Sequence, residues 1–314
     1  LSNYKPVFID INLYDYNMNL DILFKSINLK TRAIILTHTF GYPQNIDKVL
    51  DIIKIFEKKF NHKIWLINDC CHAFGAKWGN KNIGSYGDIS IYALNISKMI
   101  TSVFGGIATF QDKKLGEKFK KWRNRNFTKA TLLKSSFRRV YLITIYLAFN
   151  KNFYGFTNYL IKNSKILSSF TDSYHLDDII HFPPDYKIMM SDFEASIGLV
   201  QLQKYDKIIK HREKMAIWYD QNLIRRKGWV FPPILSGATY SHYVVRVPNR
   251  DEVIDEFEKK KINLGELIQY SIPNLNCYKK LKFNCPNSYK ASKQTINFSV
   301  TTKDKKIYKI LNNI

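Results

Sequence analysis

Short apolar runs alternate with helical patterns of hydrophobic residues over the first third of the chain. The runs Pro6–Ile11, Ala33–Thr37 and Lys63–Ile67 predict strands. The stretches Asn19–Ser26 and Asn45–Phe60 lie between them and predict helices, the second with a clear apolar face. Ala33–Thr37 is apolar almost throughout, which is typical of a strand covered on both faces of its sheet. Strands and helices that alternate at this spacing predict βαβ units and a largely parallel sheet.

The pattern becomes less regular in the middle of the chain. Two more strands, Ile89–Leu94 and Gly106–Phe110, are followed by a basic helix over Asp112–Arg125. Residues Phe127 to Phe182 mix aromatic, basic and apolar residues without a regular repeat. We expect two or three helices in this stretch. A long helix begins with a cap at Ser191 and continues, straight or kinked, toward Leu223.

The carboxyl-terminal part predicts a smaller α+β domain. Tyr240–Val247 alternates like a strand, Asp251–Lys261 reads as a helix, and Thr295–Val300 is another strand. We therefore expect an α/β fold in three parts. They are a large α/β domain over residues 1–125, an aromatic and basic helical insertion over 126–190, and a long helix leading into the small domain over 191–314.

Composition is that of a globular protein with a strong positive charge. Hydrophobic residues make up 45% of 314, which excludes disorder as the main state. The net charge of +23 has two possible explanations. It could form a surface that binds nucleic acid, membrane headgroups or a phosphorylated substrate, or it could reflect a composition biased toward Lys, Asn and Ile. Without an arginine-rich run we favour the bias and expect no nucleic-acid partner. The most apolar run, Val140–Phe149, is about half the roughly 20 residues of a membrane span, so we expect no transmembrane segment. Four cysteines are too few for a disulfide scaffold and favour a cytoplasmic protein.

The candidate chemistry lies between residues 67 and 106. Asp69 ends a buried strand, where open α/β sheets present groups to ligands, and Lys98 follows just past another strand. Gly105 and Gly106 then allow the backbone to approach a ligand closely. A lysine that binds an aldehyde and an aspartate that pairs with a pyridinium nitrogen are what pyridoxal phosphate (PLP) requires. Taken singly, the aspartate could be a cap and the lysine a surface residue.

Six segments together resemble one family. Ile67–Gly75 resembles the pattern I-E-D-A-A-Q-A-H-G of the DegT/DnrJ/EryC1/StrS sugar aminotransferases, and Gly84–Ile89 resembles G-S-x-G-D-I. Ser97–Gly106 resembles S-K-N-L-x-x-G-E-G-G, and Met190–Leu202 resembles M-S-D-x-Q-A-A-I-G-L-x-Q-L. Upstream, residues 6–10 and 38–41 resemble P-V-F-V-D and H-L-Y-G, whereas the carboxyl-terminal third matches loosely.

The resemblance implies a fold type I PLP-dependent transferase. Lys98 would be the Schiff-base lysine and proton shuttle, and Asp69 the partner of the pyridinium nitrogen. His72 would lie near the phenolic oxygen and ring face of the cofactor, although a core histidine bonded to backbone is an alternative. The implied reaction is amino transfer from glutamate to a nucleotide-linked keto sugar in polysaccharide or deoxyaminosugar biosynthesis, by a homodimer. Cys70 and Cys71 read as buried packing, and no cysteine spacing predicts a metal site.

Departures from the family pattern favour a second hypothesis. Ala93 stands where the family has a phosphate-binding serine, and Lys187 stands where it has an asparagine that reaches the partner subunit. We also find no counterpart of the family's amino-terminal segment, whose helix start holds the phosphate, and therefore expect residues 1–314 alone to bind PLP weakly and to expose apolar sheet surface. The alternative is an inactive homologue that serves as a binding or interaction protein. The stretch 129–170 would then face a membrane surface or a partner, or else pack at a dimer interface.

Overall fold

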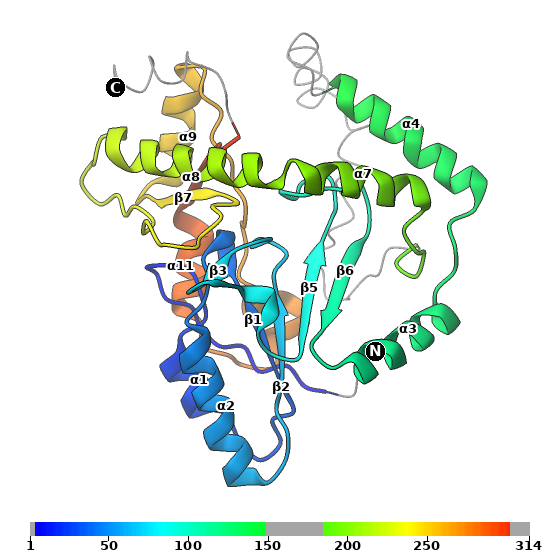
Figure 1. Cartoon of the computed structure of the whole chain (residues 1–314). Helices are drawn as coiled ribbons and strands as arrows, with labels where there is room; N and C mark the ends of the chain where they lie inside the picture. Colours follow the sequence, from blue (N-terminus) through cyan, green and yellow to red (C-terminus); the bar gives the residue numbers. More distant parts are fainter. Residues whose placement is uncertain (1–3, 149–184, 302–314) are drawn as a thin grey trace.

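A four-stranded sheet forms the centre of the amino-terminal half (Figure 1). The computed structural model describes residues 4–148 and 185–301. The strand order is β1-β2-β5-β6, where β1, β2 and β5 run parallel and β6 is antiparallel to β5. The strands are β1 (Ala33–Thr37), β2 (Trp65–Asp69), β5 (Ile89–Ala93) and β6 (Gly106–Phe110). The mainly parallel sheet and four of its predicted strands are therefore confirmed, although β2 lies two residues further along than expected.

Two helices cover one face of this sheet. Asn19 caps α1 (Leu20–Ser26) and Asn45 caps α2 (Ile46–Phe60), each through its side-chain oxygen on amides of the first turn. Both helices pack their apolar faces on the inward residues of β1 and β2, which are Ile34, Leu36 and Leu66. The helical periodicity of the sequence predicted both helices correctly.

The opposite face of β1 and β5 is open in the described part of the chain. Ile35 is 59% exposed and Ile91 is 36% exposed. The prediction that β1 is covered on both faces is therefore wrong for the residues that the structure describes. This open face carries Asp69, which lies beside Ile91 in the register.

The predicted first strand, Pro6–Ile11, does not form. Ile11 makes a single bridge to Met18, and Val7 is 55% exposed. Instead, the buried carboxylate of Asp10 accepts hydrogen bonds from the backbone amides of Asn287 and Ser288, both at 2.9 Å, in the first turn of α11 (Pro286–Gln294). The apolar run is thus held by a helix end rather than by a neighbouring strand.

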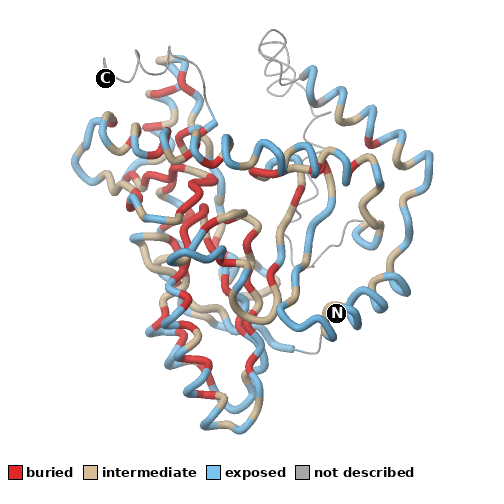
Figure 2. Tube along the Cα trace, in the orientation of Figure 1, coloured by how far each residue is buried: buried red, intermediate tan, exposed pale blue. Residues whose placement is uncertain are grey.

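Helices α3 (Lys113–Asn126) and α4 (Leu132–Ala148) lie on the β6 side of the sheet and are mostly exposed (Figures 1 and 2). Of the two or three helices expected over 127–182, α4 is observed, and residues 149–184 lie outside the described part. The long helix predicted from Ser191 breaks at Lys204 into α7 (Asp192–Gln203) and α8 (Tyr205–Asn222). In the described ranges no helix is long and apolar enough to cross a membrane.

The carboxyl-terminal part forms a second core around the antiparallel pair β7 (Tyr243–Arg246) and β8 (Thr295–Phe298). Helix α9 (Arg250–Lys259) and α11 pack against it, as the α+β prediction requires. Tyr16, Phe40 and Tyr42 from the beginning of the chain are buried in the same core.

The predicted domain boundaries at residues 125 and 190 stay a prediction. The remaining short elements are β3 (Lys77–Trp78), β4 (Lys81–Asn82), α10 (Asn276–Lys279) and the 3-10 turns η1 (Thr39–Gly41), η2 (Ile83–Ser85) and η3 (Ile272–Asn274).

Candidate active site

Asp69 lies at the middle of the carboxyl edge of the sheet. It is the last residue of β2 and is paired with Thr37 of β1 on one side and Ile91 of β5 on the other. Its Oδ1 accepts a hydrogen bond from the backbone amide of Cys71 at 3.0 Å, and this bond fixes the carboxylate beside the turn that follows the strand. No helix begins there, so Asp69 is not a helix cap.

Lys98 lies in the loop that joins β5 to β6, which we call the Lys98 loop (residues 95–105). The loop is closed by backbone bonds from Leu94 to Gly105 and from Ser102 to Leu94, at 3.0 and 2.9 Å. The turn at Lys98 is held by a bond from its own amide to the carbonyl of Asn95. Lys98 itself is half-buried, unlike a typical surface lysine.

One residue of this loop has an unusual backbone. Val103 is buried and has φ +74°, in the left-handed region that β-branched residues rarely adopt. In the motif S-K-N-L-x-x-G-E-G-G, to which residues 97–106 align, this position is glycine. The loop therefore keeps a conformation suited to glycine although a valine occupies it.

Three rings meet beside Asp69 and Lys98. The His72 ring lies nearly parallel to the Phe40 ring, with centroids 6.1 Å apart, and its centroid is 5.3 Å from that of His242. The His242 and Phe40 rings are 6.0 Å apart and meet edge to face. Because Phe40 follows β1, His72 follows β2 and His242 precedes β7, the cluster joins the sheet edge to the small domain.

The electrostatics place the three predicted residues in one site. The pKa of His72 is lowered to about 4, mainly by burial and in addition by the Lys98 ammonium, while the Asp69 carboxylate partly opposes both effects. Burial likewise lowers the pKa of His242 to about 3, with added effects of His72, Arg212 and Lys98. Both imidazoles are therefore neutral near pH 7, and His72 lies close enough to both Asp69 and Lys98 for each charge to affect it.

A second layer of polar side chains supports the end of β2. His38 is fully buried, and its Nδ1 accepts the backbone N–H of Gln44 at 3.0 Å while Nε2 lies 3.3 Å from Oδ1 of Asn68. Asn68 in turn donates to the carbonyl of Tyr86 at 2.8 Å. These bonds fix the strand end that carries Asp69, and they account for the histidine of the H-L-Y-G-like segment.

The structure brings together Asp69, His72 and Lys98, and adds Phe40 and His242, which the sequence did not indicate. His242 lies in the weakly matching carboxyl-terminal part, where it reads only as one position of an alternating strand. No spacing rule connects it to His72. Phe40 lies within the segment 38–41, which resembles the family motif H-L-Y-G. That resemblance was the only signal in the sequence that could have pointed to Phe40 as a site residue.

The residues present fit the ring of PLP better than its phosphate. A carboxylate, a neutral imidazole and a primary amine converge at the carboxyl edge of the sheet, which is the donor set that a pyridine nitrogen, a phenolic oxygen and an aldehyde require. Ala93 has no hydroxyl to offer, and the Lys187 ammonium lies 5.4 Å from the Tyr186 ring. In the described ranges no group of three or more His, Cys, Asp or Glu could hold a metal ion.

A model of the DegT/DnrJ/EryC1/StrS aminotransferase family matches residues 1–313. An uncharacterized protein of Methanocaldococcus jannaschii, MJ1066, is 27% identical over 274 residues, which are 85% of this chain and 60% of that protein. GDP-perosamine synthase of Escherichia coli O157:H7 is 23% identical over 218 residues, which are 69% of this chain and 46% of the enzyme. The chain thus spans about half the length of these curated relatives.

Solved structures of sugar aminotransferases share the fold. CalS13 of Micromonospora echinospora superposes with a TM-score of 0.70 at 17% identity, over 97% of this chain and 73% of that one. The putative sugar aminotransferase Spr1654 of Streptococcus pneumoniae, in its PLP form, gives 0.70 at 22% identity, over 98% of this chain and 74% of that one. These similarities confirm the predicted fold type I architecture.

Proposed function

The chain belongs to the DegT/DnrJ/EryC1/StrS aminotransferase family, and on this basis we propose that it takes part in PLP-dependent amino transfer to a nucleotide-linked keto sugar. Glutamate is the expected amino donor. The relative GDP-perosamine synthase supports a nucleotide-sugar substrate in polysaccharide biosynthesis. The observation that carries the proposal is the convergence of Asp69 and Lys98 on His72, whose pKa responds to both charges.

Each residue has a separate role in this proposal. Lys98 would hold the aldehyde carbon of the cofactor through Nζ and, as a free amine, would move the proton between the two carbons that exchange it. Asp69 would accept a hydrogen bond from the pyridine nitrogen and keep it protonated. Neutral His72 would contact the ring and its phenolic oxygen. When bound, PLP supplies an electron sink for the carbon that loses its proton.

We further propose a cytoplasmic homodimer. All four cysteines are free thiols, which fits a reducing compartment. The open face of the sheet, with Ile35 and Ile91 exposed, provides apolar surface that a larger assembly would cover. The oligomeric state is tested by light scattering over a range of concentrations.

The experiment that tests the function is a PLP titration followed by absorption spectroscopy. We expect a visible band that grows with PLP in the unchanged protein and is absent from Lys98→Ala. Lys81→Ala serves as the matched control, because Lys81 is an exposed hairpin lysine of the same domain. Asp69→Asn should keep the band but lose amino transfer by more than about tenfold, since general acid–base steps contribute roughly 10²–10⁴-fold. A band that persists in Lys98→Ala would refute the assignment, and a folded protein with no band would favour the inactive homologue.

A further inference from the structure

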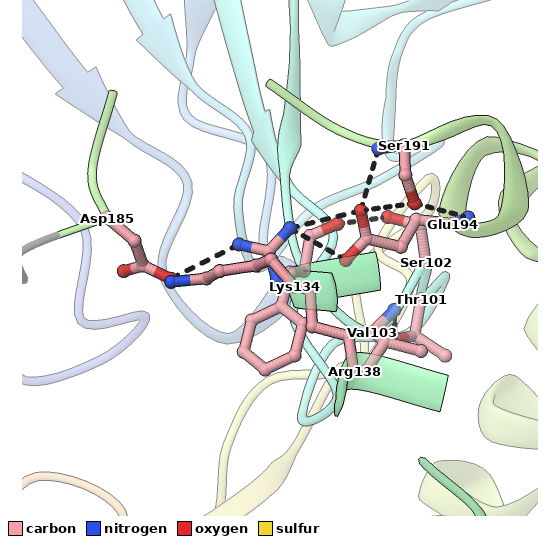
Figure 3. A network of polar contacts seen from close by, with 9 residues as sticks. Thr101, Ser102, Val103, Lys134, Arg138, Asp185, Ser191 and Glu194 are labelled. Atoms are coloured by element: carbon pink, nitrogen blue, oxygen red, sulfur yellow. Dashed lines mark hydrogen bonds and ion pairs between the residues drawn. The ribbon is translucent and has the colours of Figure 1, made fainter. Parts of the chain in front are cut away.

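The side of the Lys98 loop that faces α4 is held through one aromatic residue. The Phe104 ring lies under the guanidinium of Arg138, 4.8 Å from its carbon, and 5.6 Å from the Tyr141 ring. Both partners project from α4, and the surrounding polar contacts are drawn in Figure 3. Phe104 is therefore a contact between the Lys98 loop and two residues of α4.

Arg138 is part of a buried ion-pair network. Its side chain is 7% exposed, and Nη1 donates to both carboxylate oxygens of Glu194 at 3.0 and 3.2 Å, whereas Nη2 donates to Asp185 at 3.2 Å. Lys134 forms a second ion pair with Asp185 at 2.9 Å. The Glu194 side chain is 1% exposed. Burying such a pair costs desolvation that often cancels its attraction, so its main effect is to fix geometry.

Glu194 connects the same network to α7. Its carboxylate accepts from the backbone amide and the hydroxyl of Ser191, at 2.7 and 2.9 Å, and these bonds complete the capping box of α7. The start of α7 packs directly on the loop. A Cβ at Gly198 would lie 3.4 Å from Cβ of Ser102, and one at Gly105 would lie 2.6 Å from Cε of Met190.

Two positions of the network depart from the family motifs together. Phe104 stands where S-K-N-L-x-x-G-E-G-G has glutamate, and Glu194 stands where M-S-D-x-Q-A-A-I-G-L-x-Q-L has glutamine. The acidic group is thus on the helix rather than on the loop, and Arg138 of α4 contacts both positions.

We propose that Arg138 and Glu194 are positioning residues that fix the Lys98 loop, and hence the direction in which Lys98 approaches the cofactor. The inference rests on the proposed function of Lys98. The ion pair joins α4 to α7, and Phe104, which follows the strained Val103, joins α4 to the loop.

The test compares Arg138→Met/Glu194→Gln, which removes both charges at similar volume, with Arg138→Lys, which keeps the charge but cannot bond both oxygens at once. Arg125→Met is the control, because Arg125 is an exposed arginine of α3. The measurements are the melting temperature, the rate at which PLP attaches to Lys98, the pH midpoint of that rate, and hydrogen exchange of residues 95–105.

We expect the double variant to melt close to the unchanged protein, but to attach PLP about 10- to 100-fold more slowly, since small misplacements of reacting groups have effects of this size. Its pH midpoint should shift and its loop amides should exchange faster, whereas Arg125→Met should behave as the unchanged protein. Arg138→Lys should fall between the two, and it decides the question if the double variant does not fold.

A folded double variant with the unchanged rate, pH midpoint and loop exchange would overturn the proposal. Failure of the proposed function looks different, because the unchanged protein itself would then not attach PLP. In that case hydrogen exchange of the loop and acylation of Lys98 by a small reagent still report on its position, since neither measurement needs the cofactor. Equal values in all variants would again overturn the inference.

Discussion

Acidification should destabilise this fold through His38. The imidazole is fully buried, and because Nδ1 accepts the Gln44 N–H, its single proton lies on Nε2 and is donated to Asn68. A second proton on Nδ1 would point at the Gln44 amide. Burial therefore lowers the pKa of His38 from 6.5 to about 4, although Asn68 and Asp69 partly oppose this effect.

The sign and size of the effect follow from proton linkage. As the pH falls below about 6.5, the unfolded chain takes up a proton at this histidine before the folded chain does, so the free energy of unfolding falls until about pH 4. The difference between the two pKa values corresponds to about 3 kcal/mol, at about 1.4 kcal/mol per pKa unit. His72 and His242, whose pKa values are also lowered, act in the same direction.

Urea denaturation at a series of pH values between 7 and 4 measures this effect. His38→Gln cannot titrate, so its free energy of unfolding should fall by about 3 kcal/mol less than that of the unchanged protein over this range. An imidazole resonance of His38 that titrates near pH 6.5, or identical pH dependence of the two proteins, would refute the reasoning.

Two further predictions concern charged contacts outside the candidate site. Asp10→Asn should lower the free energy of unfolding by about 2 kcal/mol in urea denaturation, because it weakens charge-assisted bonds to the amides of Asn287 and Ser288, and a loss below about 0.5 kcal/mol would contradict this. Glu256 bonds Arg226 through both oxygens, which lowers its pKa to about 2, so the contact should stabilise the fold above about pH 4.5 and lose this effect as the pH falls toward 2. The gain is small since both side chains are partly exposed, and Glu256→Gln should remove the acid-dependent part from a melting-temperature profile.

The elements that the sequence predicted best are those whose pattern is local. The apolar face of α2 and the continuous apolar runs of β1 and β6 depend on residues close in the chain, so periodicity was sufficient. The run Pro6–Ile11 has the same apolar pattern and fails, because a strand also needs a neighbour with free backbone groups. In the described structure the Asp10 carboxylate instead accepts hydrogen bonds from backbone amides in the first turn of α11, which lies far along the chain.

The candidate site shows the same division. Asp69, His72 and Lys98 lie within sequence motifs, so their proximity followed from the order of strands and loops. His242 comes from the small domain, and its contact with His72 depends on how two cores pack together. The Arg138–Glu194 pair likewise joins residues 56 positions apart, and no local pattern indicates it. Contacts between distant segments are what a sequence pattern alone does not contain.

The most direct test of the central claim is to locate the lysine that binds the cofactor. The protein is incubated with PLP, reduced with borohydride, digested and analysed by mass spectrometry, with the digest of Lys98→Ala as the reference. We predict that the reduced pyridoxyl group is found on the peptide that contains Lys98 and on no other at limiting PLP. Modification spread over exposed lysines, or an unmodified Lys98 in a folded protein, would contradict the assignment of this site as a PLP-dependent aminotransferase centre.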